Sequence, residues 1–216
     1  MKALQERTWD WKTAALAAIS GCVLALGAGA ARAQDLSKAV LLVASPTLQG
    51  LYSHALVAVV PVDGTHMGFI LNRATDLALA ELFPQHAPSA KVADPVYLGG
   101  REMAHSIFAV TRRDPGGEAL ELFDHLYVTA SIKRIIEQTP NDARYFAGFV
   151  GWEPGELQNE IDEGDWYVTG PDSSLFFRPD TSGLWEELVK RLGNGHLPEQ
   201  GHGLLRSKLE SAPGLL

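Results

Sequence analysis

Residues 148–166 read Gly-Phe-Val-Gly-Trp-Glu-Pro-Gly-Glu-Leu-Gln-Asn-Glu-Ile-Asp-Glu-Gly-Asp-Trp, and no other stretch says as much about how this chain folds. Pro154 suits the first turn of a helix, where its missing N–H is not needed. Leu157 and Ile161 are four residues apart, so a helix places both on the face toward the core. Gly164 can close that helix in a left-handed conformation. The stretch therefore predicts a strand-turn-helix corner that leads into a second strand.

Two interpretations of this corner are open. Gly148 and Gly151 are expected to let the backbone pass close to Trp152 or Trp166, which makes the corner a packing element. The alternative is that the corner lines a groove for a ligand or partner near the two tryptophans. The packing interpretation is favoured, because such glycines usually mark turns or close approaches.

Upstream of the corner, apolar runs predict the centre of a sheet. Val40–Ala44, Ala55–Val62 and Met67–Leu71 are short and bounded by turn residues, as strands are. Asp63-Gly64 lies between the second and third runs and is a strong hairpin signal.

The rest of the pattern alternates short helices and short strands. We expect helices at 76–83 after an N-cap at Thr75, at 131–138, and from Leu184 to an end at Gly193, with strands at 96–98, 106–111, 120–123, 126–129, 144–150 and 166–169. There are no repeats and no linker long enough to divide the chain, so the sequence predicts one compact α+β domain over residues 38–193 and a flexible tail over 194–216.

The N-terminus has the order of a secretory signal. Three basic residues precede an uncharged run at 13–31, and Ala31-Arg32-Ala33 follows as a small-residue cleavage site. We expect residues 1–33 to be a signal peptide cleaved after Ala33 and the protein to be exported, to the periplasm in a bacterium with two membranes. The alternative is an uncleaved anchor, because the run is long enough to cross a bilayer of about 30 Å. Membrane contact is expected only through this segment.

Cys22 is the only cysteine of the chain. Ile19-Ser20-Gly21-Cys22 has the residue types of a lipoprotein processing box, which makes Cys22 a possible lipidation site. The apolar run continues past it, which favours an ordinary signal segment instead. After cleavage the chain has no cysteine, so disulfides, thiol nucleophiles and cysteine metal sites are excluded.

No catalytic or metal-binding set stands out. The seven histidines have no helical zinc spacing and accompany no hydrolase or phosphate-loop motif. His105 and His125 lie at predicted strand starts, where a sheet can bring them together as a cryptic hydrolase site. The acidic run at 153–165 lacks the alternating ligands of a calcium loop and is interpreted as a solvated helix face. We expect no metal, no cofactor and no catalytic residue.

Charge argues against a nucleic-acid partner. Removing residues 1–33 takes four basic and two acidic residues, which leaves 24 acidic against 14 basic residues and a formal charge of −10. Duplex binding depends on Lys and Arg that neutralise phosphates. Direct DNA binding is not expected.

Four ordered motifs carry a family resemblance. Leu42-Val43-Ala44-Ser45-Pro46, Gly68-Phe69-Ile70-Leu71-Asn72-Arg73, Tyr97-Leu98-Gly99-Gly100 and the segment 148–161 resemble the bacterial YqgE/AlgH family. The resemblance implies a bent, barrel-like mixed sheet surrounded by short helices, and a family whose biochemical activity is not established. It marks as motif or possible binding residues Asn72, Arg73, Gly99, Gly100, Gly151, Trp152, Gly155, Glu156, Leu157, Glu160 and Trp166.

The chain departs from the family pattern in three places. The family usually reads Gly-Gln-Leu-Glu where this chain has Gly155-Glu156-Leu157-Gln158, and Gly-Gly-Pro-Val where it has Gly99-Gly100-Arg101-Glu102. The signal-like segment is the third departure, because typical members begin near the first strand and are taken to be cytoplasmic.

The expected function is that of a non-enzymatic accessory or regulatory interaction protein. Its partner would be another protein or a small ligand. The alternatives are a small-ligand-binding protein with a groove near Trp152 and Trp166, and a cryptic hydrolase.

Mass spectrometry of the protein purified from its native host tests the N-terminal prediction. Cleavage predicts a mature chain that starts at Gln34. A lipidated Cys22 would instead indicate a lipoprotein, and an intact Met1 would contradict processing altogether.

Overall fold

The computed structural model describes residues 35–193 with their side chains. The predicted signal segment, Cys22, the Ala33 cleavage site and the predicted tail at 194–216 lie outside these residues. Within 35–193, no helix is both long and apolar enough to cross a membrane.

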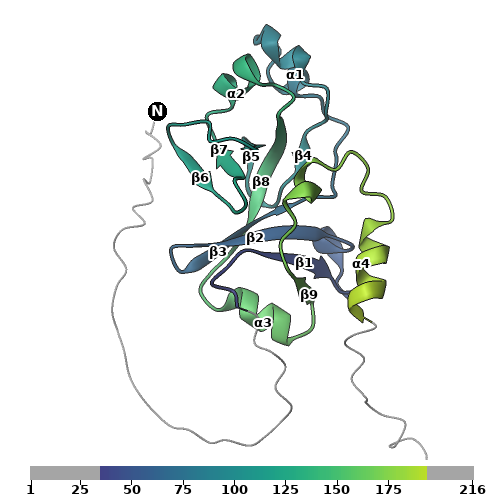
Figure 1. Ribbon diagram of the computed structural model, residues 1–216. Helices are drawn as coiled ribbons and strands as arrows, with labels where there is room; N and C mark the ends of the chain where they lie inside the picture. The colour runs from purple at the N-terminus through teal and green to yellow at the C-terminus, as the bar shows by residue number, and fades with distance from the viewer. Residues whose placement is uncertain (1–34, 194–216) are drawn as a thin grey trace, which may run out of the picture. The chain divides into compact units, whose positions relative to one another are not determined.

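A curled, half-barrel sheet is the centre of this α+β domain (Figure 1). Its strands run in the order β6-β7-β5-β8-β3-β2-β1-β9, and β4 pairs with β8 off this path. The β4–β8 pair is parallel and the other pairs are antiparallel, so the sheet is mixed as well as bent, as predicted. The bounds are β1 Val40–Ala44, β2 Leu56–Val62, β3 Thr65–Ile70, β4 Tyr97–Leu98, β5 Glu102–Thr111, β6 Ala119–Glu121, β7 Tyr127–Thr129, β8 Ala143–Trp152 and β9 Trp166–Thr169.

The predicted β2–β3 hairpin is confirmed. Val62 lies opposite Thr65, which leaves Asp63 and Gly64 as a two-residue turn. Both turn residues have positive φ, 48° and 85°, as a type I′ turn requires.

Short helices pack around the sheet. The α-helices are α1 Leu79–Leu82, α2 Ile132–Gln138, α3 Glu156–Asp162 and α4 Leu184–Gly193, and the 3₁₀ turns are η1 Gly50–Tyr52, η2 Ala87–Lys91 and η3 Ser173–Phe177. The apolar faces predicted for α2 and α4 are confirmed, because Ile132, Ile135 and Ile136 are buried, as are Leu184 and Leu188.

The helix predicted to begin after Thr75 begins only at Leu79. The backbone N–H and the hydroxyl of Thr75 both donate to the carbonyl of Val96, at 2.9 and 2.6 Å. Val96 N–H in turn donates to the Leu77 carbonyl at 2.9 Å. Residues 75–77 therefore run beside the segment before β4, and this tertiary pairing overrides the local helical pattern.

The sheet buries side chains on both of its faces. Along β1, Leu41 and Val43 belong to a core cluster that packs under η3 and α4, whereas Val40, Leu42 and Ala44 belong to a second cluster that packs under α3. A third cluster lies between α2 and the β5–β8 region. Burial on both faces explains why β1 is an unbroken apolar run.

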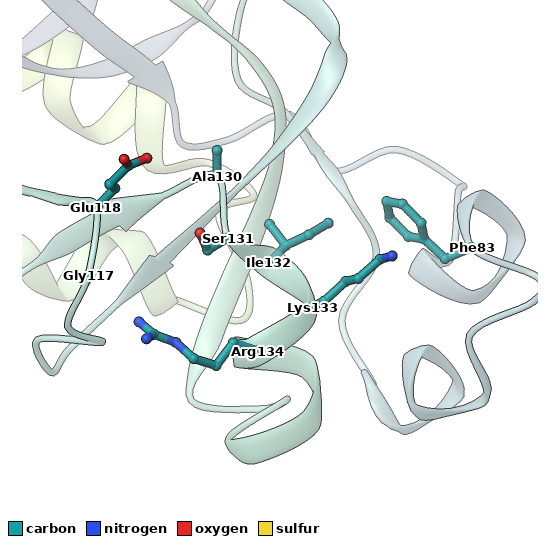
Figure 2. Close-up of a pocket in the computed structure, with 8 residues that line it drawn as sticks. All are labelled: Phe83, Gly117, Glu118, Ala130, Ser131, Ile132, Lys133 and Arg134. Carbon is teal, nitrogen blue, oxygen red and sulfur yellow. The ribbon is translucent and has the colours of Figure 1, made fainter.

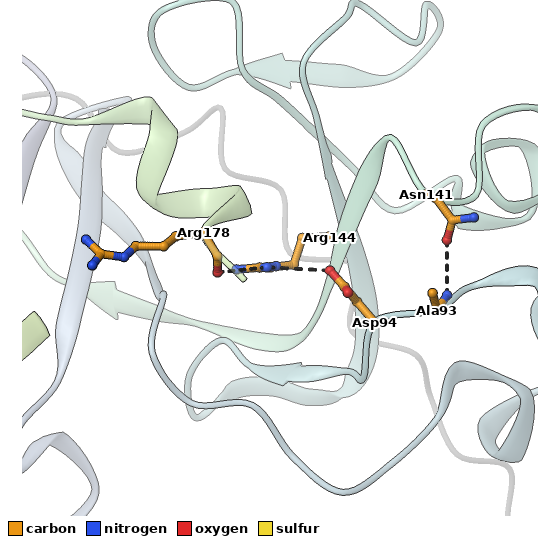
Figure 3. Close-up of polar contacts among 5 residues, drawn as sticks. All are labelled: Ala93, Asp94, Asn141, Arg144 and Arg178. Atoms are coloured by element: carbon orange, nitrogen blue, oxygen red, sulfur yellow. Dashed lines mark hydrogen bonds and ion pairs between the residues drawn. The ribbon is translucent and has the colours of Figure 1, made fainter. Parts of the chain in front are cut away.

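Arg144 is the largest polar group in this core, with 1% of its surface exposed. Figure 3 shows its guanidinium between the Arg178 carbonyl, at 3.1 Å, and the Asp94 carboxylate, at 3.5 Å. It also stacks over the ring of Tyr97 at 4.2 Å. These contacts fasten the chain after η3 to β4 and β8.

β8 lies between two groups of strands, β6-β7-β5 with β4 on one side and β3-β2-β1-β9 on the other, and it bends at Gly148. Its first half pairs with β5 and β4, and its last residues pair with β3. Gly148 has a φ of 68°, and a Cβ there would lie 2.6 Å from the Glu102 carbonyl oxygen. We expected Gly148 to make room for a tryptophan. That prediction is wrong, because the neighbours are the backbone of Gly100 and the backbone at the start of β5, at Glu102 and Ala104.

Gly99 and Gly100 complete this close approach. A Cβ on Gly99 would overlap the Gly148 carbonyl, and a Cβ on Gly100 would overlap the Phe149 carbonyl. Gly99 N–H also donates to the Ala147 carbonyl at 2.8 Å. Two segments of backbone are thus in direct contact, which only glycine allows.

Replacing Gly100 with alanine tests this contact. The added methyl group has to displace backbone, so we expect Gly100→Ala to lower the free energy of unfolding by about 1–3 kcal/mol or more in urea titrations. Gly170→Ala is the matched control, because nothing lies within 4 Å of its Cβ. Equal stabilities of the two variants would contradict the close approach.

Candidate functional site

One carboxylate joins the two tryptophans of the 148–166 segment. Glu160 Oε2, on α3, accepts the indole N–H of Trp152 at 2.8 Å and that of Trp166 at 2.7 Å. Both tryptophans are buried, with 4% and 5% of their surface exposed. Hydrogen bonds to a charged acceptor are stronger than neutral ones. Glu160 therefore locks α3 to the end of β8 and to the start of β9.

The turn before α3 is a type II turn. Glu156 N–H donates to the Glu153 carbonyl at 3.0 Å, and Gly155 has φ 84° and ψ −15°. Pro154 therefore occupies the second turn position. The prediction that Pro154 lies in the first helical turn is wrong, since α3 begins at Glu156.

Both ends of α3 are closed by local bonds. At the start, Glu156 Oε2 accepts the N–H of Glu153 at 2.8 Å. At the end, Gly164 has the predicted left-handed conformation, with a φ of 84°, and Asp165 N–H donates to the Glu160 carbonyl at 3.0 Å. Leu157 is fully buried and Ile161 packs against the same core cluster, as predicted.

A small pocket opens beside this corner. Its volume is about 250 Å³. We call it the Glu160 pocket, and it is lined by Tyr52, Arg101, Glu102, Val150, Gly151, Trp152, Glu156, Glu160 and Trp166. Of the predicted residues, Gly151, Trp152, Glu156, Glu160 and Trp166 line it.

Asn72 and Arg73 contribute to the pocket indirectly. Asn72 accepts the Leu56 N–H at 3.0 Å and donates to the His54 carbonyl at 2.8 Å. Arg73 Nη2 donates to the Leu51 carbonyl, at 3.3 Å, and to the Ser53 carbonyl. These two carbonyls flank Tyr52, so the Asn72-Arg73 motif holds η1 in the position that brings Tyr52 to the pocket.

Gly99 and Gly100 position the part of the pocket rim that Arg101 and Glu102 form. The close contact of their backbone with β8 puts the next two residues, Arg101 and Glu102, at the edge of the pocket. Both are exposed. Gly151 leaves space there, because a Cβ on it would meet only the Glu102 Cγ at 3.4 Å and the Phe149 ring at 3.6 Å.

The pocket residues that the sequence did not single out are Tyr52, Arg101, Glu102 and Val150. Arg101 and Glu102 had one signal, since they replace Pro and Val of the family pattern. Tyr52 had none, because it is far away in sequence and arrives through the bonds of Arg73.

The charged side chains of the rim affect the pKa of the Tyr52 hydroxyl. Burial is the main cause that raises the pKa of the Tyr52 hydroxyl, Arg101 opposes it, and Glu160, Glu102 and Glu156 raise it further. The hydroxyl therefore stays protonated at neutral pH and can donate a hydrogen bond. Its ring meets Trp166 edge-on, with 6.1 Å between ring centroids.

The interpretation of 153–165 as a solvated acidic face is wrong for Glu160, because its carboxylate accepts both indole N–H groups. Glu156 is exposed, as that interpretation predicts, and also accepts the Glu153 N–H. Within residues 35–193, no group of three or more His, Cys, Asp or Glu residues is placed to hold a metal ion.

The sheet does not bring His105 and His125 together. Thr111 of β5 lies opposite Tyr127 of β7, so His125 lies beyond the Thr111 end of β5 while His105 lies toward the other end. The histidine site predicted for a hydrolase is therefore wrong.

Another serine, histidine and carboxylate do lie in a row. His86 contacts Ser89 Oγ at 2.9 Å through Nδ1 and Glu137 at 3.2 Å through Nε2. Ser89 is fully buried, so this row joins η2 to α2 and presents no nucleophile to solvent.

A larger and more open pocket lies at the start of α2 (Figure 2). Its volume is about 490 Å³, and Phe83, Ile132 and Lys133 are among its walls. Arg134 is held by the carbonyls of Pro115 and Gly116. None of the residues predicted from the family motifs lines it.

Removing the Glu160 carboxylate tests whether its two indole hydrogen bonds stabilise the fold. Glu160→Ala leaves two buried indole N–H groups without a partner, and each costs about 1–3 kcal/mol. We therefore expect a loss of at least about 2 kcal/mol in the free energy of unfolding, and a smaller loss for Glu160→Gln, which keeps an acceptor oxygen. Glu163→Ala, an exposed position just after α3, is the matched control. A Glu160→Ala protein as stable as this control would rule out the clamp.

Comparisons with known proteins agree with this architecture. The solution structure of the AlgH protein from Pseudomonas aeruginosa superposes with a TM-score of 0.62 at 21% identity, covering 85% of this chain and 97% of that one. A crystal structure of a Corynebacterium diphtheriae protein gives a TM-score of 0.59 at 23% identity, with coverage of 72% and 86%. At these identities the likeness concerns the fold.

Sequence comparison adds the family. A UPF0301 protein of Parabacteroides distasonis is 31% identical over 166 residues, covering 72% of this chain and 83% of the relative. One of Ruegeria pomeroyi is 34% identical over 143 residues, covering 61% and 76%. The AlgH-like family model matches residues 41–196. The resemblance carried by the four motifs is thereby confirmed, and the chain belongs to the AlgH-like family of UPF0301 proteins.

Proposed function

We propose that this protein acts by binding, as a non-enzymatic accessory or regulatory protein that recognises a small ligand in the Glu160 pocket. The observation that carries the proposal is the convergence of three separate motif segments on one pocket. Asn72-Arg73 positions Tyr52, Gly99-Gly100 positions Arg101 and Glu102, and 151–166 supplies the tryptophans and the carboxylates.

Some polar groups near the pocket are used by the fold and others are free, which supports recognition of a ligand. The two indole N–H groups donate to one oxygen of Glu160, and the side chains of Asn72 and Arg73 bond to the backbone. These groups hold the structure around the pocket. The side chains of Arg101 and Glu102 and the Tyr52 hydroxyl make no hydrogen bond or ion pair within the described part of the chain and remain available to a ligand.

The chemistry of the lining also favours binding over reaction. Among its nine residues there is no serine, threonine, cysteine, lysine or histidine. The remaining side chains of types that serve as covalent nucleophiles are three glutamates and Tyr52, and two of these glutamates, Glu156 and Glu160, are engaged in structural hydrogen bonds. The lining groups instead bind through charge, hydrogen bonds and aromatic surface.

The expected place of action follows from the N-terminal segment. As an exported protein, it would meet its ligand outside the cytoplasm. This placement is part of the proposal and rests on residues 1–33 of the sequence.

A side chain placed in the pocket tests the proposal. Gly151→Leu fills the space beside Glu102 without meeting backbone, and Gly170→Leu adds the same side chain at an open position elsewhere. We expect members of a metabolite library to shift the indole NMR signals of Trp152 and Trp166 in the full-length protein and in Gly170→Leu. The shifts should be lost in Gly151→Leu.

Resolved indole signals are preferable to total fluorescence, because the chain has five tryptophans. Shifts that persist in Gly151→Leu would place binding elsewhere. A library that shifts neither indole would contradict the proposed function.

A further inference from the structure

Charges of both signs face the Glu160 pocket without neutralising one another. The lining carries one guanidinium, that of Arg101, and three carboxylates, those of Glu102, Glu156 and Glu160. The ion pairs within residues 35–193 include none of these four side chains, so Arg101 lies more than 4.0 Å from each carboxylate. Opposite charges held apart around one small volume leave room for a ligand that pairs with both.

The carboxylates differ in how much of their bonding capacity is used. Glu160 receives two indole N–H groups at 2.7 and 2.8 Å on one oxygen. Glu156 receives one backbone N–H at 2.8 Å on one oxygen. Glu102 receives none from the described residues. Glu102 and Glu156 are therefore the acceptors for a positively charged ligand group, while Arg101 is the donor for a negative one.

Tyr52 lines the same pocket as all four charged side chains. Burial is the main cause that raises the pKa of its hydroxyl, Arg101 lowers this pKa and the three carboxylates raise it. The Tyr52 and Trp166 rings add an aromatic wall. Aromatic faces attract cations as well as apolar groups.

The size of the pocket limits the ligand. About 250 Å³ is below the range of roughly 300–1,000 Å³ that holds drug-sized molecules. A single amino acid fits this scale, and a folded peptide segment does not.

We infer that the Glu160 pocket binds a free amino acid as a zwitterion, with the ligand carboxylate on Arg101 and its ammonium group between Glu102 and Glu156. This inference rests on the proposed function and adds the class of ligand. Since the lining holds three negative groups and one positive group, amino acids with a basic side chain bind more tightly than acidic ones.

Four probes separate the contributions of the charges. L-arginine carries both charges of the zwitterion and a cationic side chain. Agmatine lacks the carboxylate, Nα-acetyl-arginine lacks the ammonium group, and L-glutamate reverses the side-chain charge. Binding of each to the full-length protein is measured by calorimetry and by the Trp152 and Trp166 indole signals.

We expect L-arginine to bind at least about tenfold more tightly than each of the other three probes, as expected when one charge-assisted hydrogen-bonded contact is lost. Arg101→Gln should weaken L-arginine by about tenfold and should not weaken agmatine, because agmatine has no carboxylate for Arg101 and loses only a like charge. Glu102→Gln should weaken agmatine and leave Nα-acetyl-arginine nearly unchanged. Arg113→Gln and Glu163→Gln, exposed positions outside the pocket, are the matched controls and should bind like the parent.

The possible results distinguish the two levels of the proposal. Equal affinities of L-arginine and agmatine, or an unchanged L-arginine affinity in Arg101→Gln, would overturn the zwitterion inference while leaving a binding pocket. So would library ligands that shift the indoles, are blocked by Gly151→Leu and carry no ammonium group. If no probe and no library member shifts the indoles, both the inference and the proposed function fail.

Discussion

The contact of two glycines with the backbone of β8 is the constraint on which the rest of this domain depends. Gly99 and Gly100 lie so close to residues 148–149 that a Cβ on either would overlap a carbonyl group. The contact coincides with the bend of β8 at Gly148. Beyond it the strand keeps one pair with β5, Phe149 with Glu102, and then pairs with β3. A curled sheet and a charged rim therefore have the same origin, because this contact also sets where β5 begins.

The Glu160 clamp stabilises the other side of the same bend. Its two indole bonds connect α3 to strands at separate places in the sheet, since β8 and β9 are not neighbours. A buried tryptophan usually needs a partner for its N–H. Here a single carboxylate serves two of them, which places a charged residue at the base of a pocket and leaves the rim to other side chains. The wall is thus fixed before any ligand arrives, which lowers the entropic cost of binding.

Local sequence patterns predicted much of the fold. The β2–β3 hairpin, the core faces of α2 and α4 and the left-handed Gly164 all follow from interactions within a few residues, and all are confirmed. The start of α1 was predicted wrongly because Thr75 is bonded to Val96, a partner that its neighbours in sequence do not reveal.

The candidate site was predictable only in part for the same reason. The motif that contains Trp152, Glu160 and Trp166 was visible as a segment, but its acidic residues read as a solvated face. Whether a carboxylate meets water or an indole depends on where β9 returns to the sheet. No local pattern could have indicated Tyr52. It is positioned by hydrogen bonds from Arg73 to the two carbonyls beside it, and these bonds span 22 and 20 residues of the chain.

The positions where this chain departs from the family motifs gain a physical meaning in the pocket. Glu156 caps its turn through a side-chain oxygen, and glutamine, the usual residue there, offers an oxygen at the same place. Arg101 and Glu102 are exposed, and neither is needed for the glycine contact before them. The fold therefore does not require a charge at any of these three positions, yet all three line one pocket. Because the glycines, the tryptophans and Glu160 fix the shape, the residues at the rim are free to set the charge of what binds.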